Sequence, residues 1–144
     1  MRSSIFSVRR HYAGIDVMFL LLRLVIGLAF VIHGWPKIHD PLHWMGKDAS
    51  FAPIWQALAA ISEFCGGIAL MLGFLTRIAA FGILCTMAVA VYEVHFVYKA
   101  PFVNTTGPIS FEIPAVYFVI MLLFIVGGPG RISLDRLLFG SKTI

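Results

Sequence analysis

Four long apolar segments, separated by short stretches of turn-forming residues, set the pattern of hydrophobic and polar positions along the chain. They run over residues 15–36, 53–75, 78–98 and 110–128. The fourth is apolar only from Ile113 onward and uses the preceding turn to reach across a bilayer. About 20 apolar residues in a helix cross the hydrocarbon core of a membrane, and lipid offers the backbone no hydrogen-bond partners, which favours helices. The pattern therefore predicts an all-α fold, an integral membrane four-helix bundle that forms a single domain over residues 1–144.

The turn-forming residues agree with these limits. Pro36 follows the first segment, and Pro53 opens the second, where a proline is tolerated in the first helical turn. Ser110 is expected to cap the fourth helix, and the glycine-rich run 127–130 is expected to end it. Residues 133–139 then have the pattern of a short amphipathic C-terminal helix that lies at the membrane interface.

Composition narrows the class of protein. The chain is 60% hydrophobic and only 12% charged, whereas soluble domains are roughly half apolar and about a quarter charged. This excludes an ordinary cytosolic enzyme, and it equally excludes a disordered chain, which needs the opposite composition. The net charge is +4, but no basic stripe or RNA-binding motif accompanies it, so we expect no nucleic-acid partner.

The basic residues predict an orientation, because Lys and Arg concentrate on the cytoplasmic side of membrane proteins. A cytoplasmic N-terminus places seven of them inside: Arg2, Arg9, Arg10, Arg77, Arg131, Arg136 and Lys142. The outer side then holds Lys37, Lys47 and Lys99. All the tryptophans, namely Trp35, Trp44 and Trp55, fall at the outer boundary, as in an aromatic belt. We therefore expect both termini to be cytoplasmic.

Ionisable residues inside the apolar segments are the main functional signal. Each costs at least ~2.5 kcal/mol at membrane depth, so each must face a partner, a cavity or water. The candidates are Arg23, His33, Lys37, Glu63, Glu93, His95 and Glu112. For Glu112, at the start of the fourth helix, the simplest role is to complement the helix dipole.

A helical wheel groups the other candidates. One face of the first helix carries Arg23, Gly27, Gly34 and Lys37, with His33 beside it. On the second helix, Glu63 shares a face with Gly67. The third helix carries a stripe formed by Arg77, Leu84, Ala88, Val91 and His95. Small residues on such faces allow helices to approach closely, so we expect these faces to point inward. His33, Lys37, Glu63 and His95 then form a polar cluster in the outer half of the bundle. Arg23 lies deeper and is expected to pair with Asp16.

Glu93 does not fit this grouping. It precedes His95 by two residues and so points to roughly the opposite side of the third helix. We expect it to face a groove beside the fourth helix, the headgroup layer or a neighbouring protein. A protein partner or a second copy of the chain, in addition to the lipid bilayer, is therefore expected.

The polar cluster has three possible uses. The first is to bind the head of a quinone-like ligand, with His33, Lys37, Glu63, His95 and Arg23 as the binding set and with Glu63 or His33 as the catalytic proton-exchanging group. The second, which we disfavour, is ligation of a b-type haem by His33 and His95. The third is a buried salt-bridge network that only sets the register of the helices. The residues alone leave all three open.

Two further features are expected to carry no chemistry. His39 and His43 have a spacing that can hold a metal on a helix, but Pro41 interrupts them, so we expect no metal site. Cys65 and Cys85 lie within apolar segments without a C-x-x-C pattern, so we expect them to be buried packing residues.

Several motifs, in order, resemble those of the DoxX family. They are Arg23-Leu24-Val25-Ile26-Gly27, His33-Gly34 with Lys37, Glu63-Phe64-Cys65-Gly66-Gly67, residues 73–80, then Met87, Ala90 and His95, and finally residues 127–130 with Ser133, Leu134 and Asp135. The similarity extends over about residues 17–136, nearly the whole chain.

The resemblance implies a small bacterial-type protein of the cell inner membrane. The family includes subunits named for thiosulfate:quinone oxidoreduction and proteins linked to oxidative stress and sulfur metabolism. It therefore implies a quinone-linked membrane oxidoreductase or a subunit of one. The alternative is a non-catalytic accessory subunit of a larger respiratory-type complex. A small transporter is less favoured, because four helices without an inverted repeat are a small basis for alternating access.

Overall fold

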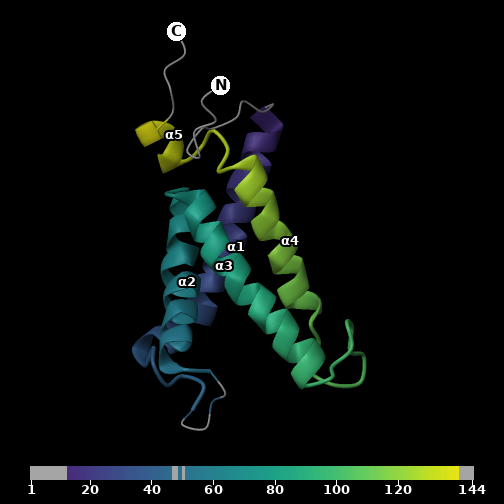
Figure 1. The fold of residues 1–144 in the computed structure, drawn as a ribbon. Helices are drawn as coiled ribbons and strands as arrows, with labels where there is room; N and C mark the ends of the chain where they lie inside the picture. Colours follow the sequence, from purple (N-terminus) through teal and green to yellow (C-terminus); the bar gives the residue numbers. More distant parts are fainter. Residues whose placement is uncertain (1–12, 47–48, 50, 140–144) are drawn as a thin grey trace.

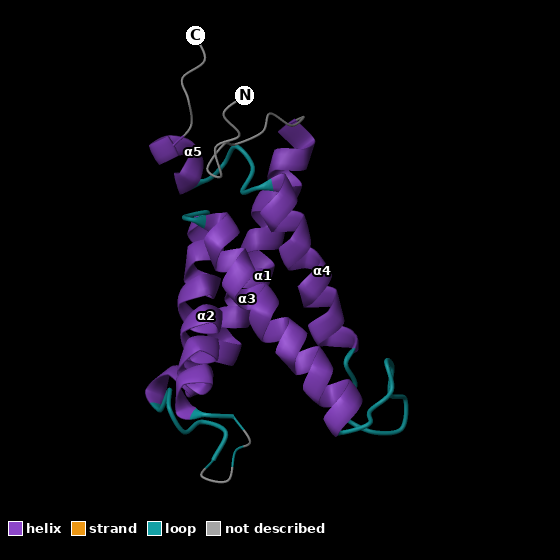
Figure 2. Ribbon diagram, in the orientation of Figure 1, coloured by secondary structure: helices purple, strands orange, loops and turns teal. Residues whose placement is uncertain are grey.

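The computed structural model describes residues 13–46, 49 and 51–139, and these residues form helices and loops without any strand (Figure 2). The helices are α1 (Ala13–His39), α2 (Pro53–Leu72), α3 (Thr76–Tyr92), the π-helix η1 (Glu93–Val97), α4 (Glu112–Gly127) and α5 (Leu134–Phe139). The predicted all-α fold is confirmed, and the four long helices follow the four apolar segments.

Three of the helical segments are long and apolar enough to cross a membrane: Gly14–His39, Pro53–Leu72 and Thr76–Val97. The fourth, Glu112–Gly127, is apolar but shorter. Many large apolar side chains on the outward faces are exposed, among them Val25, Ile32 and Val119. A helical bundle with apolar outward faces is suited to lipid rather than water, and the chain is a membrane protein.

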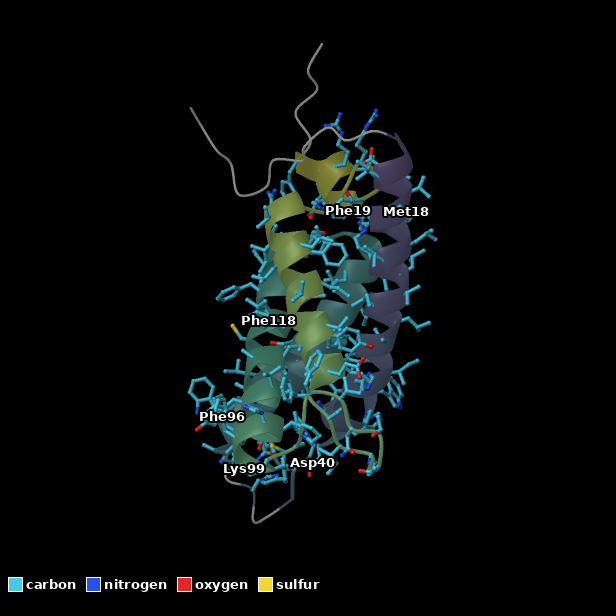
Figure 3. The ribbon with its side chains drawn as sticks, turned by 90° about the vertical axis from the view of Figure 1, so that its right-hand side faces the viewer. Met18, Phe19, Asp40, Phe96, Lys99 and Phe118 are labelled. Carbon is cyan, nitrogen blue, oxygen red and sulfur yellow. The ribbon has the colours of Figure 1, made fainter. Side chains whose placement is uncertain are left out.

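The bundle has two different ends (Figure 1). At the terminal end lie the start of α1, the end of α4, α5 and the short turn between α2 and α3. At the loop end lie the connections from α1 to α2 and from η1 to α4; Figure 3 labels Asp40, Phe96 and Lys99 at this end. Of the basic residues used above for orientation, Arg2, Arg9, Arg10, Lys47 and Lys142 lie outside the described residues.

Backbone-to-backbone packing joins α1 and α2. A Cβ atom added at Gly27 would lie 2.7 Å from the carbonyl oxygen of Gly67, and one added at Gly34 would lie 2.6 Å from the amide nitrogen of Phe64. Real Cβ atoms do not approach backbone atoms so closely, so no larger residue fits at these positions without moving the helices. The predicted close approach of these two small-residue faces is confirmed.

The core lies where α1, α3 and α4 meet the second half of α2. It is built from the buried residues Phe19, Ile26, Phe30, Leu70, Ala80, Ile83, Met87, Met121 and Phe124. On α3 the buried side runs through Thr76, Ala80, Ile83 and Met87. The predicted inward stripe through Ala88 and His95 is therefore wrong, since both residues are exposed. A helix that is apolar on every side has no polar face to set its rotation, so the wheel could not place it.

The chain after α4 folds back over the terminal end. Both carboxylate oxygens of Asp135 accept hydrogen bonds there, Oδ1 from the backbone nitrogen of Leu75 at 2.7 Å and Oδ2 from that of Thr76 at 2.9 Å. Asp135 thereby satisfies free donors at the start of α3, where no nearby side chain caps the helix. The predicted C-terminal helix is confirmed as α5, with the backbone nitrogen of Arg136 bound to Ser133 Oγ at 3.2 Å.

The same segment forms hydrogen bonds with two charged residues of α1. Asp16 Oδ1 accepts a hydrogen bond from the backbone nitrogen of Arg131 at 2.9 Å, and Arg23 donates from Nη2 to the carbonyl oxygen of Ile132. The expected pairing of Arg23 with Asp16 is therefore wrong. Each of them binds backbone of the C-terminal segment, which the sequence of α1 alone could not reveal.

Two predicted helix boundaries also change. α1 continues through Pro36 to His39. A proline removes one backbone hydrogen bond, and transmembrane helices tolerate it because neighbouring groups and small local adjustments satisfy the freed carbonyl. At α4 the residue before the helix is Phe111, without a side-chain cap, so the expected Ser110 cap is wrong. α4 ends at Gly127 as predicted. The extension of α1 places Lys37 on the helix.

The contact between α1 and α2 generates the first testable prediction. Gly67→Ala would place its Cβ 2.7 Å from a backbone oxygen, and we expect it to lower the free energy of unfolding by about 1–3 kcal/mol. Gly66→Ala is the matched control, because its Cβ would lie 3.2 Å from side-chain atoms of Ile83 and 3.6 Å from the nearest backbone atom, the carbonyl oxygen of Ala79. Thermal unfolding of the purified protein in detergent measures both. Equal losses of stability in the two variants would contradict the packing described here.

Candidate functional site

An ion pair joins α1 to α2 near the loop end. Nζ of Lys37 lies 2.7 Å from both carboxylate oxygens of Glu63. The Glu63 side chain is only 3% exposed, and that of Lys37 is 22% exposed. The two residues meet because Gly34 lets α1 rest on the backbone of Phe64, beside Glu63. The pair makes a buried carboxylate tolerable, since an unpaired charge at such a place is very costly.

The ammonium of Lys37 has a second neighbour. Its Nζ lies 4.4 Å from the ring centroid of Trp44, within the range of a cation–π interaction. Trp44 in turn donates from Nε1 to the carbonyl oxygen of Gln56 at 3.0 Å. Lys37 is thus held between a carboxylate of α2 and an aromatic ring of the connection from α1 to α2.

A groove with a volume of about 620 Å³ opens beside this pair, between the first half of α2 and the second half of α3. Figure 1 shows these helices meeting at their turn and separating toward the loop end. We call it the α2–α3 groove, and its mostly apolar lining consists of Lys37, Trp44, Met45, Phe51, Trp55, Gln56, Leu58, Ala59, Ser62, Glu63, Gly82, Cys85, Thr86, Val89, Ala90 and Glu93. Its size lies within the ~300–1,000 Å³ of small-molecule sites.

Gln56 anchors the connection that borders the groove. The residue is buried; its Oε1 accepts a hydrogen bond from the backbone nitrogen of Met45 at 3.1 Å, and its Nε2 donates to the carbonyl oxygen of Phe51 at 3.0 Å. Sequence reasoning missed this residue. The available signal was a lone amide in the otherwise apolar first turn of α2.

The structure brings together only part of the predicted binding set. Lys37 and Glu63 are in contact and line the groove, whereas Arg23, His33 and His95 do not line it. Arg23 is 1% exposed and lies at the terminal end against the C-terminal segment.

The two histidines occupy separate, exposed positions. His33 donates from Nδ1 to the carbonyl oxygen of Ala29 at 2.7 Å. The ring of His95, on η1, packs against Phe96 and Phe111, with centroids 4.5 and 4.8 Å away.

Glu93 is the groove residue that the sequence grouping misplaced. It follows Thr86 by seven residues and Val89 by four, so regular α-helical spacing puts all three on the groove side of α3. The helix then widens into η1, where the backbone nitrogen of Tyr98 donates to the carbonyl oxygen of Glu93 at 3.0 Å. Glu93 therefore faces the α2–α3 groove, and not a groove beside the fourth helix.

Both cysteines are exposed free thiols, so the expectation of buried packing residues is wrong. In a membrane bundle apolar side chains also cover the outer surface, and an apolar helix position is no sign of burial. Cys85 lines the α2–α3 groove, whereas Cys65 does not. Among residues 13–46, 49 and 51–139, no group of three or more His, Cys, Asp or Glu side chains is placed to hold a metal ion.

The fold and the site define a small helical membrane protein with an ion pair beside an apolar groove, and comparison with known proteins identifies its family. The chain belongs to the DoxX family, whose model matches residues 18–96. No solved structure matches the chain.

Two similar proteins are inner membrane proteins of Escherichia coli. YqjF is 31% identical over 129 residues, which cover 85% of this chain and 93% of YqjF. YphA is 32% identical over 127 residues, covering 83% and 89% of the two chains. A Haemophilus influenzae protein described as uncharacterized is 31% identical over 121 residues, covering 82% and 88%.

The ion pair generates the second prediction. Lys37→Met leaves the buried Glu63 without its partner, and we expect a loss of unfolding free energy toward the lower end of the ~3–5 kcal/mol typical of broken buried pairs, because Lys37 is partly exposed. Adding Glu63→Gln to that variant should restore part of the loss, since the unpaired charge is then gone. Unfolding of the two single variants and the double variant in mixed micelles gives the coupling free energy. A coupling close to zero would show that the pair does not hold α1 and α2 together.

Proposed function

We propose that this protein binds a lipophilic ligand with a polar head, of the quinone type, in the α2–α3 groove, and that it is a quinone-linked membrane oxidoreductase or a subunit of one. The observation that carries the proposal is the position of the Lys37–Glu63 pair in the lining of a mostly apolar groove of about 620 Å³. Apolar walls with a few convergent polar groups are typical of small-molecule sites.

The residues of the pair have distinct roles in this proposal. The Lys37 ammonium has three N–H donors, of which two are directed to the oxygens of Glu63. The third is available to a carbonyl oxygen of the ligand's head. Glu63 is the proposed proton-exchanging group, and His33, one turn before Lys37 on α1, remains a candidate for the same role. A bound quinone would supply the electron-carrying chemistry.

The aromatic side chains suit the rest of such a ligand. Trp44, Phe51 and Trp55 line the groove close to the loop end, next to the ion pair. Flat aromatic side chains provide a large apolar contact area for a ring and its isoprenoid or alkyl chain. The groove would thereby hold the head against the ion pair and leave the tail along the apolar walls.

The orientation belongs to the same proposal. Arg77, Arg131 and Arg136 lie at the terminal end, and Lys37 and Lys99 lie at the loop end. With the terminal end in the cytoplasm, as the distribution of basic residues favours, the groove lies in the outer half of the membrane. The inner-membrane names of the two Escherichia coli relatives support placing this protein in the cell inner membrane.

A non-catalytic accessory subunit of a larger membrane complex is the alternative from another class. In that case the ion pair only sets the register of α1 against α2, and the protein would co-purify with a large partner. The two proposals differ in one respect that can be measured, because only the first requires a small molecule in the groove.

Thiol protection tests the proposal. In a Cys65→Ser variant the remaining Cys85 reports on the groove, and in a Cys85→Ser variant the remaining Cys65 reports on a surface outside it. We expect a fully substituted ubiquinone analogue at ten times its dissociation constant to slow the reaction of Cys85 with a membrane-permeant maleimide about tenfold, by mass action. The reaction of Cys65 should be unchanged. Equal rates with and without the analogue at both cysteines would exclude this ligand site.

A further inference from the structure

The two sides of the α2–α3 groove differ in how their ionisable side chains are paired. Glu63 lines the groove from α2 with Lys37 bound to it, so that this side is neutral and carries a hydrogen-bond donor. Glu93 lines the groove from the end of α3, where η1 begins. Within the part of the chain that the structure describes, the Glu93 carboxylate forms no ion pair or side-chain hydrogen bond.

The regular geometry of α3 directs Glu93 into the groove. It continues the spacing of Thr86 and Val89, and the π-turn that holds Tyr98 to its carbonyl oxygen follows it at once. The half-buried carboxylate shares its side of the groove with the apolar residues Val89 and Ala90, and no side chain among the described residues donates a hydrogen bond to it.

An ionised carboxylate is an acceptor only, and leaving it without a donor in an apolar surrounding is costly. A ligand that brings an O–H group to Glu93 would remove this cost with a charge-assisted hydrogen bond, the stronger kind. A quinone carbonyl brings another acceptor and gains nothing there. The corresponding hydroquinone has a hydroxyl at each end of its ring, one able to accept from Lys37 and the other able to donate to Glu93.

We propose that Glu93 makes the α2–α3 groove selective for the reduced, hydroxyl-bearing form of its ligand, a lipophilic hydroquinone, over the oxidised quinone. The inference rests on the proposed function and adds which redox form the site prefers and which residue sets that preference. It involves binding alone. One hydrogen bond to a charged group corresponds to roughly a tenfold difference in affinity.

The experiment compares dissociation constants for the two redox forms of one fully substituted ubiquinone analogue under anaerobic conditions. Protection of Cys85 in the Cys65→Ser background is the readout. We expect the hydroquinone to bind about tenfold more tightly than the quinone. Glu93→Gln should abolish or reverse this ratio, because an amide can donate to a carbonyl oxygen. Glu112→Gln, at the start of α4 and outside the groove lining, is the matched control and should retain the ratio.

The ratio separates a role in selectivity from damage to the fold. A substitution that only disturbs the groove weakens the binding of both redox forms together and leaves the ratio of their dissociation constants unchanged. That result for Glu93→Gln would overturn the role of Glu93. Equal affinities of the wild-type groove for the two forms would overturn the inference while leaving the proposed function intact. Protection by neither form would overturn both.

Discussion

The close approach of α1 and α2 is the constraint on which the site depends. Gly27, Gly34 and Gly67 remove the side chains that would hold the two backbones apart, and only then can Lys37 reach both oxygens of Glu63. The ion pair is therefore a consequence of helix packing as much as a contributor to it. With α2 held against α1, and α3 joined to α2 by a short turn at the terminal end, the helices separate toward the loop end and the groove lies between them.

The two ends of the bundle use their polar residues differently. At the terminal end Asp16, Arg23 and Asp135 bind backbone atoms and attach the C-terminal segment to α1 and to the α2–α3 turn. These contacts hold the helices together where they converge. Near the loop end Lys37 and Glu63 bind each other, and Glu93 retains an unused carboxylate in the groove lining. An end where the helices converge (Figure 1) and an end where an apolar groove opens suit the proposed site for a small lipophilic molecule.

The sequence was sufficient to predict features that are local, and to predict a contact formed by the small-residue faces of two adjacent helices. Apolar length predicted the helices, and the glycine faces of α1 and α2 predicted the contact that brings Lys37 to Glu63. It was insufficient for α3, since a helix apolar all round does not reveal its rotation; His95 was therefore placed inward and Glu93 away from the site. Cys85 was predicted to be buried but is exposed, because the sequence does not distinguish apolar positions that face lipid from those that face the core. The partners of Arg23 come from a segment more than a hundred residues away.

We propose the α2–α3 groove, beside the Lys37–Glu63 pair, as the ligand site. Photolabelling tests it most directly, with a ubiquinone analogue that carries a photoreactive azide on its ring, applied to the full chain in membranes and followed by peptide mapping. We expect labelling within residues 53–63 and 82–93, the two sides of the groove, and we expect excess unlabelled analogue to suppress it. Labelling confined to α4 or to the exposed face of α1, or labelling that excess analogue does not suppress, would contradict it.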